Sequence, residues 1–299
     1  MSLPLPAPAA APAPAGLVTR LRAAGCVFAE DEAQLLLSTA RTPSDLTAMT
    51  DRRVAGHPLE QVLGWAEFCG LRIAVDPGVF VPRRRTEFLV AQAAALLRAR
   101  GTAGPRPVVV DLCCGTGAVG AALAAAAALF PASPAPPSPT PSSAPPSAPP
   151  RIDLHATDIE PAAVRCARRN LRPTNGQVYE GDLYAPLPPA LRGRVDLLVV
   201  NAPYVPTDAI GLLPPEARDH EPRVALDGGA DGLDVQRRVA ADALRWLAPG
   251  GHLLIETSGR QAPHTLAAFR RGGLVTRLAT DDDLSATVAI GTSPSTGTP

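Results

Sequence analysis

Two largely apolar runs form the strongest pattern in the chain. Residues 108–112 and 195–200 are rich in valine and leucine, and runs of this length suit strands that are buried on both faces of a sheet. Shorter runs predict further strands at 152–158, 177–180, 252–256, 275–278 and 286–290. Helical spacing of apolar residues falls between them, at 86–100, 118–130, 161–170, 234–247 and 260–271. Strands that alternate with helices in this way predict a doubly wound α/β sheet.

The segments that precede the predicted α/β sheet, and one segment within it, have different patterns. The amino-terminal segment is mostly proline and alanine, and residues 131–150 hold ten prolines and five serines, so neither can build a core. Helical spacing before Gly64 predicts two or three helices, and strand-like alternation around Asp76-Pro77-Gly78 predicts a hairpin. Thr86 is placed to cap the next helix. We therefore expect, in chain order, a disordered tail (1–15), a small helical domain (16–64), a β-hairpin linker (65–84), the α/β domain (85–292) with a disordered insert (131–150), and a second disordered tail (293–299).

The charge balance argues against a protein that binds nucleic acid through its overall charge. Twenty-eight basic and 28 acidic residues cancel, so we expect no strong direct nucleic-acid binding. All 28 basic residues are arginine. Without lysine, the chain cannot form a Schiff base with a substrate or use a phosphate-loop lysine.

Neither a metal site nor a membrane segment is expected. The five cysteines form no Cys-x-x-Cys pair and the five histidines are scattered, so we predict no metal ligands and free thiols in a reducing compartment. No apolar stretch approaches the length of about 18 residues that a spanning helix needs, and the amino-terminal segment lacks the basic region of a signal peptide. We therefore expect a cytoplasmic protein that makes no membrane contact.

A glycine loop follows the first long strand. Residues 115–120 (Gly-Thr-Gly-Ala-Val-Gly) fit the pattern G-x-G-x-x-G, and Asp158 ends the next strand, where its carboxylate can accept hydrogen bonds from ribose hydroxyls. An NAD-dependent oxidoreductase needs these two features, and so does a methyltransferase that uses S-adenosylmethionine. The loop alone leaves both functions open, although no histidine follows the first four strands in a position suited to hydride transfer.

The second long strand ends in Asn201-Ala202-Pro203-Tyr204, and ligands of open parallel sheets bind beyond such strand ends. Pro203 restricts its own backbone and that of Ala202. The Asn201 side chain and the Ala202 carbonyl then offer two acceptors to one planar amino group, while Tyr204 can cover its face. An Asx turn that only ends the strand is the alternative. Amino methyltransferases carry Asn-x-Pro-Tyr at this position, so the glycine loop and the strand end together favour methyl transfer.

These motifs and three further segments resemble the protein-(glutamine-N5) methyltransferases, the HemK or PrmC family that modifies peptide-chain release factors, and their ribosomal-protein relative PrmB. The likeness runs from about His57 to Ile290. The further segments lie at 58–68 (Pro-Leu-Glu-Gln-Val-Leu-Gly, then Glu-Phe), 79–87 (Val-Phe-Val-Pro-Arg, then Thr-Glu) and 221–233 (Glu-Pro-Arg-Val-Ala-Leu-Asp-Gly-Gly, then Asp-Gly-Leu).

The resemblance implies a Rossmann-like class I fold and methyl transfer from S-adenosylmethionine to the side-chain amide nitrogen of a glutamine. The implied partner is a protein with an exposed glutamine, either a release factor in translation termination or a ribosomal protein. The resemblance assigns the methyl-acceptor site to Asn201, Ala202, Pro203 and Tyr204. It assigns the cofactor contacts to Cys113, Cys114, Gly115, Thr116, Gly117, Asp158, Asp182, Leu183 and Asn201.

Three departures from the family pattern predict a divergent paralogue. Ala202 replaces the first proline of Asn-Pro-Pro-Tyr, Arg84-Arg85 replace Pro-Asp or Pro-Glu, and Cys113-Cys114 begin the glycine loop. Two other functions stay open. An adenine-N6 or other nucleic-acid amino methyltransferase would offer the same planar amino group to the site, but the neutral charge and the lack of a target-recognition domain argue against it. A catalytically silent cofactor-binding protein is the second alternative, because of Ala202.

Overall fold

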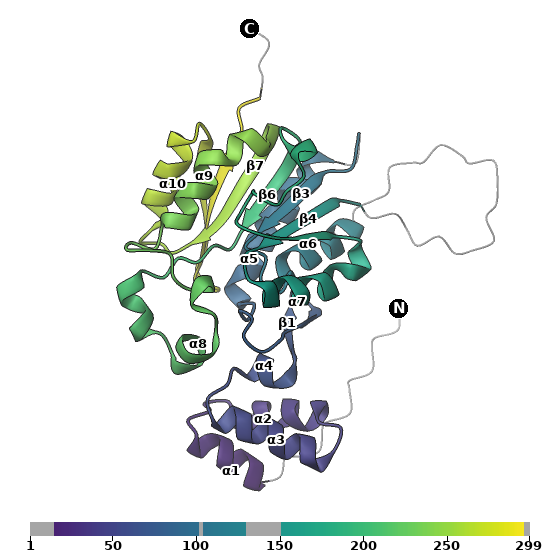
Figure 1. Cartoon of the computed structure of the whole chain (residues 1–299), viewed down its shortest axis with the longest axis vertical. Helices are drawn as coiled ribbons and strands as arrows, with labels where there is room; N and C mark the ends of the chain where they lie inside the picture. Colours follow the sequence, from purple (N-terminus) through teal and green to yellow (C-terminus); the bar gives the residue numbers. More distant parts are fainter. Residues whose placement is uncertain (1–14, 102–103, 130–150, 296–299) are drawn as a thin grey trace, which may run out of the picture.

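A computed structural model of the chain describes residues 15–101, 104–129 and 151–295 (Figure 1). The strands of its large sheet are β3 (Val108–Leu112), β4 (Asp153–Asp158), β5 (Gln177–Glu180), β6 (Val195–Val200), β7 (Leu247–Thr257), β8 (Val275–Asp281) and β9 (Ala286–Thr292). They lie in the order β5-β4-β3-β6-β7-β9-β8, and all are parallel except β9, which is antiparallel to both neighbours. Strand order reverses between β3 and β6, so the predicted doubly wound sheet is confirmed.

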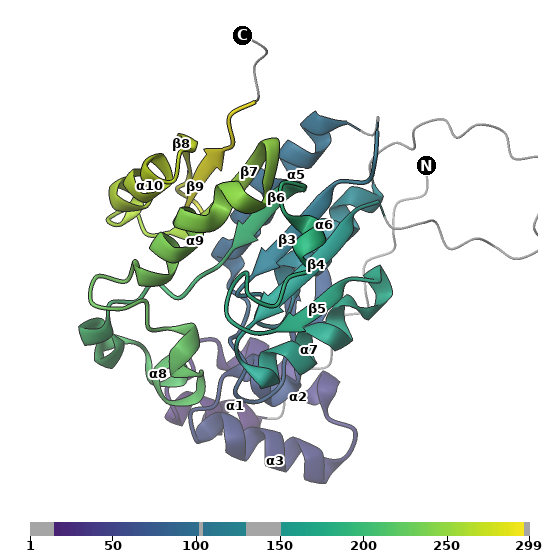
Figure 2. The same ribbon diagram turned by 45° about the horizontal axis from the view of Figure 1, so that its top comes forward.

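Helices cover both faces of this sheet (Figure 2). One face packs against α5 (Glu87–Arg100), α6 (Ala118–Ala128) and α7 (Pro161–Leu171), and the other packs against α9 (Asp234–Trp246) and α10 (Ala262–Arg271). Val109 belongs to the first core, whereas its neighbours Val108 and Val110 belong to the second. This alternation explains why the β3 sequence is apolar at every position but Asp111, since both faces of the strand are buried.

The amino-terminal part of the described chain holds four helices rather than the predicted two or three. They are α1 (Ala15–Ala23), α2 (Ala29–Thr39), α3 (Pro43–Val54) and the short α4 (Leu59–Leu63). A core of their own includes Leu21, Leu36 and Val62. The Thr42 hydroxyl accepts a hydrogen bond from the Asp45 amide at 3.1 Å, so the Thr-Pro-Ser-Asp sequence caps α3 as its residue types favour.

The predicted hairpin exists, but its turn was placed wrongly. The strands are β1 (Trp65–Phe68) and β2 (Leu71–Ala74), joined by Cys69 and Gly70, which both have positive φ. Two consecutive residues in the left-handed conformation match the twist of a tight hairpin, although cysteine rarely adopts that conformation. The Asp76-Pro77-Gly78 segment does turn, with a hydrogen bond from the Val79 amide to the Asp76 carbonyl at 3.2 Å, but it leads into an extended segment rather than a strand.

A long connection between β6 and α9 completes the described fold. It contains α8 (Pro215–His220) and the short 3₁₀ helices η4 (Thr207–Leu212) and η5 (Arg223–Ala225). The other 3₁₀ helices of the described residues are η1 (Arg84–Thr86), η2 (Arg172–Thr174) and η3 (Pro189–Leu191). Arg53 of α3 forms an ion pair with Glu216 of α8 at 2.7 Å. Gln61 donates to the Val79 carbonyl at 3.0 Å, so the helical part, the linker and this connection are joined. The predicted insert 131–150 and tail 1–15 lie outside the described residues, except for residue 15.

Candidate active site

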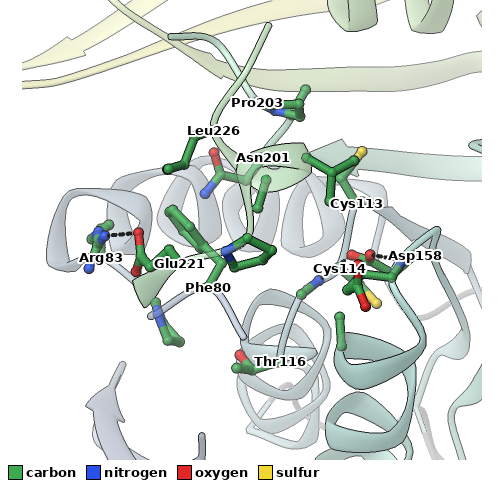
Figure 3. Close-up of a pocket in the computed structure, with 18 of the residues that line it drawn as sticks. Phe80, Arg83, Cys113, Cys114, Thr116, Asp158, Asn201, Pro203, Glu221 and Leu226 are labelled. Carbon is green, nitrogen blue, oxygen red and sulfur yellow. Dashed lines mark hydrogen bonds and ion pairs between the residues drawn. The ribbon is translucent and has the colours of Figure 1, made fainter. Parts of the chain in front are cut away.

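A cavity of about 680 Å³ opens at the carboxyl ends of β3, β4, β5 and β6 (Figure 3). This position is the point where strand order reverses, which is where open α/β sheets bind their ligands. Two segments from elsewhere in the chain also line the cavity, namely the linker around residues 80–86 and the connection around residues 213–226. Of the residues predicted from the sequence, the cavity lining includes Cys113, Cys114, Gly115, Thr116, Asp158, Asp182, Leu183, Asn201, Ala202, Pro203 and Tyr204.

The glycine loop after β3 bends sharply at the cavity wall. Cys113 and Gly115 have φ values of 55° and 53°, and a Cβ atom added to Gly115 would meet no protein atom within 4 Å. Glycine at this position therefore leaves space in the cavity that a ligand can fill. Gly117 is not part of the lining, because it turns the chain into α6 and a Cβ there would lie 3.1 Å from Leu171.

The carboxylate of Asp158 is fixed by two backbone donors. The Gly115 amide donates to Oδ2 at 2.8 Å and the Glu160 amide to Oδ1 at 2.9 Å. Burial raises the pKa of Asp158 above its ordinary value, while these two amides oppose the shift. Each carboxylate oxygen carries a second lone pair, so Asp158 can accept two further hydrogen bonds from neighbouring hydroxyls of a ligand.

The wall beyond β5 combines an exposed ion pair with apolar groups. Asp182 forms an ion pair with Arg238 of α9 at 2.5 Å. Leu183 is buried with a φ of 49°, and Ile159 after β4 also lines the cavity although it is 52% exposed. Two aliphatic side chains beside a fixed carboxylate suit a flat heterocycle joined to a ribose.

Asn201, the first residue after β6, lies at the end of the cavity that also holds Phe80 and Leu226 (Figure 3). Its Nδ2 donates to the Thr86 hydroxyl at 3.4 Å. Thr86 stands at the predicted cap position of α5, yet its side chain makes no cap hydrogen bond there. Within the described part of the chain, Oδ1 of Asn201 has no partner, so it is an available acceptor at the cavity.

Glycines hold the connection close against the backbone that follows Asn201. Gln261 at the start of α10 donates to the Tyr204 carbonyl at 2.9 Å. A Cβ on Gly228 would lie 2.7 Å from the Pro203 carbonyl oxygen, and one on Gly232 would overlap the Tyr204 carbonyl. The segment 227–233 needs its glycines because backbone packs directly on backbone here.

The Tyr204 side chain joins a polar group at the end of β7. Its hydroxyl donates to Oε1 of Glu256 at 3.4 Å, and Nε of Arg85 donates to the same oxygen at 3.2 Å. Glu256 is 2% exposed. Burial and the Glu256 carboxylate raise the pKa of Tyr204 to about 12, so its hydroxyl stays protonated at neutral pH and cannot act as a base.

A buried carboxylate ties the linker to the connection. Glu221 accepts from Arg83 at 2.6 Å and from the Val81 amide at 3.0 Å, and its side chain has no exposed surface. The sequence did not indicate this contact. It did mark both segments, because 79–87 and 221–233 are two of the stretches that carry the family resemblance.

Asp111, within β3, is a cavity residue that the sequence prediction missed. It is 1% exposed, and its Oδ2 accepts a hydrogen bond from the Gly120 amide at 3.0 Å. Burial raises the pKa of Asp111 to about 7. A single acid inside an otherwise apolar strand, four residues before the glycine loop, was the available signal.

Within residues 15–101, 104–129 and 151–295, the His, Cys, Asp and Glu side chains form no cluster of three or more that could hold a metal ion. No helix in these residues is long and apolar enough to cross a membrane.

The sequence of the chain is similar to those of proteins that are named as methyltransferases. The chain is 38% identical over 215 residues to the "Release factor glutamine methyltransferase" of Streptomyces coelicolor, which covers 71% of this chain and 68% of that protein. It is 36% identical over 259 residues to the protein of the same name from Mycolicibacterium smegmatis, covering 85% and 82%. It is also 36% identical over 261 residues to the "4-amino-L-phenylalanine/4-methylamino-L-phenylalanine methyltransferase" of Streptomyces pristinaespiralis, covering 85% and 80%.

More distant comparisons add little. Models of known protein families give no match. A solved methyltransferase from Pyrococcus furiosus covers 83% of this chain and 99% of its own, with 14% identity and a TM-score of 0.48.

Proposed function

The chain belongs to the family of release factor glutamine methyltransferases, and from this membership and the cavity we propose that it methylates the side-chain amide nitrogen of a glutamine in a protein substrate. The methyl donor is S-adenosylmethionine. The observation that carries the proposal is that one cavity holds both the Asp158 carboxylate with its glycine loop and the Asn201 amide. The relatives are named methyltransferases, which argues against the NAD-dependent alternative.

The cavity residues fit the proposed cofactor. The open space at Gly115 allows a ligand to approach the backbone, and Asp158 has lone pairs for the two ribose hydroxyls. Leu183 and Ile159 would pack against the adenine, with Asp182 at its edge. The remaining cofactor contacts would come from Cys113, Cys114, Thr116 and Asn201. Gly117 would act only indirectly, by shaping the loop.

The acceptor would bind to the segment 201–204. Oδ1 of Asn201 and the Ala202 carbonyl would each accept one N–H of the glutamine amide, while Pro203 keeps this turn rigid and Tyr204 covers the amide plane. When bound, the cofactor supplies a methyl group attached to a positively charged sulfur. The two acceptors hold the nitrogen in line for transfer and stabilise the positive charge that grows on it. No strong base is required, because the proton leaves only after the nitrogen has become cationic.

A free aromatic amine is the second candidate acceptor. The relative from Streptomyces pristinaespiralis is named for 4-amino-L-phenylalanine and is similar to 85% of this chain. An aromatic amino group is flattened by conjugation with its ring and also carries two N–H groups, so the same two acceptors could hold it. For the glutamine reaction, we propose a release factor or ribosomal protein as the partner, and with it a cytoplasmic enzyme; a release factor would give the enzyme a role in translation termination.

Labelling with radioactive S-adenosylmethionine tests this function. Purified protein is incubated with the labelled cofactor and an extract that contains proteins and small molecules, and Asn201→Ala serves as the matched control. We expect label in one polypeptide, at a glutamine located by mass spectrometry, and loss of that label with Asn201→Ala. Label in nucleic acid or in a small amine would replace the proposed acceptor. Cofactor binding with no labelled product would indicate the silent binding protein.

A further inference from the structure

Arg85 is a cationic residue at the acceptor end of the cavity. The next residue, Thr86, contacts Asn201 at 3.4 Å, and the Arg85 guanidinium lies over the Tyr204 ring at 5.7 Å from its centre. Arg85 lines the cavity, and 46% of its side chain is exposed. A positive group is therefore held beside the segment that we propose binds the acceptor.

Only one edge of this guanidinium is used. Nε donates to Glu256 at 3.2 Å, whereas the two terminal nitrogens have no hydrogen-bond partner within residues 15–101, 104–129 and 151–295. Glu256 is almost fully buried, so the pair orients the guanidinium from behind. The terminal nitrogens of arginine form a fork that matches the two oxygens of a carboxylate.

The other charged side chains of the cavity leave this role to Arg85. Arg83 already uses one of its terminal nitrogens on the buried carboxylate of Glu221 at 2.6 Å, and Arg238 is paired with Asp182 at the cofactor end. Glu60, which also lines the cavity, would repel an anion, and Glu216 is paired with Arg53. Position 85 is also one of the departures named in the sequence analysis, because the family resemblance implies an acidic residue where this chain has arginine.

We propose that Arg85 binds a carboxylate of the acceptor substrate, next to the nitrogen that receives the methyl group. This inference rests on the proposed methyl transfer and narrows its substrate to an acceptor that carries an acid group. Two sources share that chemistry, namely an acidic side chain beside the target glutamine in a protein and the α-carboxylate of a free amino acid. An acid at residue 85 would disfavour both by charge repulsion.

Two matched pairs of acceptors test the contact. The first pair is a short peptide with one glutamine followed by glutamate, and the same peptide with leucine in place of the glutamate. The second pair is 4-aminophenylalanine and its carboxamide. Release of S-adenosylhomocysteine gives kcat/KM for each acceptor. In at least one pair we expect the acidic member to be preferred about 10- to 100-fold, the range for hydrogen bonds to charged groups. The pair that discriminates identifies the source of the carboxylate.

Variants of the arginine complete the test. Arg85→Gln should abolish the preference for the acidic member, and Arg84→Gln should keep it, because Arg84 is a neighbouring arginine outside the cavity lining. Arg85→Gln leaves Glu256 buried without its cation, so the double variant with Glu256→Gln removes both charges and must give the same loss of preference. Equal rates within both pairs would overturn the carboxylate contact and leave the proposed reaction standing. No transfer to any of the four acceptors by cofactor-bound protein would count against both proposals.

Discussion

Replacing Thr86 by valine removes the hydroxyl that holds the Asn201 amide and changes little else in size. The hydrogen bond is long, at 3.4 Å, and joins two neutral groups, so we assign it the ordinary net value of about 0.5–1.5 kcal/mol. Without it, the amide plane can rotate and Oδ1 spends less time toward the acceptor. If only the correctly placed amide supports transfer, kcat should fall by about 2- to 13-fold, which is the same free energy expressed as a ratio.

The assay compares three variants with wild type under single-turnover conditions. Asn201→Ala removes the acceptor itself and should lower kcat by about 10²- to 10³-fold, as loss of one preorganised polar contact does elsewhere. Thr86→Ser keeps a hydroxyl and should stay near wild type. Affinity for S-adenosylhomocysteine, measured by calorimetry, should change little in the two Thr86 variants and much less than kcat in Asn201→Ala, because Asn201 is only one of several proposed cofactor contacts. The reasoning would be refuted if Thr86→Val were as slow as Asn201→Ala, or if Thr86→Ser and Thr86→Val were equally impaired.

Three further predictions concern the cavity walls. Asp158→Asn places an NH₂ group against one of two backbone donors, so we expect a loss of about 1.5–3 kcal/mol, a melting temperature lower by about 3–12 °C and weaker cofactor binding; an unchanged melting curve would contradict this. The pKa of Asp111 is raised from 3.8 to about 7, so its stabilising contribution is full below pH 3.8 and is lost as the pH rises through 7. Urea unfolding should therefore show that Asp111→Asn loses less stability than wild type between these pH values, and parallel curves would contradict the assignment. Gly250 and Gly232 both have φ near 75°, but only Gly232 faces the Tyr204 carbonyl. Gly250→Ala should cost about 1–2 kcal/mol in unfolding experiments and Gly232→Ala about 1–3 kcal/mol more, with lost turnover; equal costs would show that the segment 227–233 is not tightly packed.

The sheet was predictable because its strands are short apolar runs whose ends carry the turn residues. Residues 108–112, 177–180 and 195–200 match β3, β5 and β6 at both ends. The hairpin turn was misplaced because Asp76-Pro77-Gly78 has the stronger turn chemistry, whereas the actual turn uses Cys69 in a left-handed conformation that its residue type does not favour. Local propensity could not identify that turn, since it depends on pairing between β1 and β2.

The site was predictable to the extent that it is made by strand ends. Parallel strands bring Asp158 and Asn201 to one edge of the sheet, because Asp158 is the last residue of β4 and Asn201 directly follows β6. Thr86, Arg85 and Glu221 reach the same cavity from the linker and the connection. No spacing rule relates those segments to the strands, because their positions depend on contacts across more than a hundred residues, such as the ion pair between Arg83 and Glu221.

The construction of the cavity from two sources has a consequence for how this family diversifies. The strand ends supply everything proposed for the methyl donor, whereas the linker and the connection supply most of the walls around the acceptor. A substitution in the linker or the connection can therefore alter the walls around the acceptor without replacing any residue proposed for the donor. Two relatives that are each 36% identical to this chain are named for different acceptors, a release factor glutamine in one case and 4-amino-L-phenylalanine in the other. Reversing the charge of a single residue in the segment 80–86, such as Arg85, would be a change of this kind.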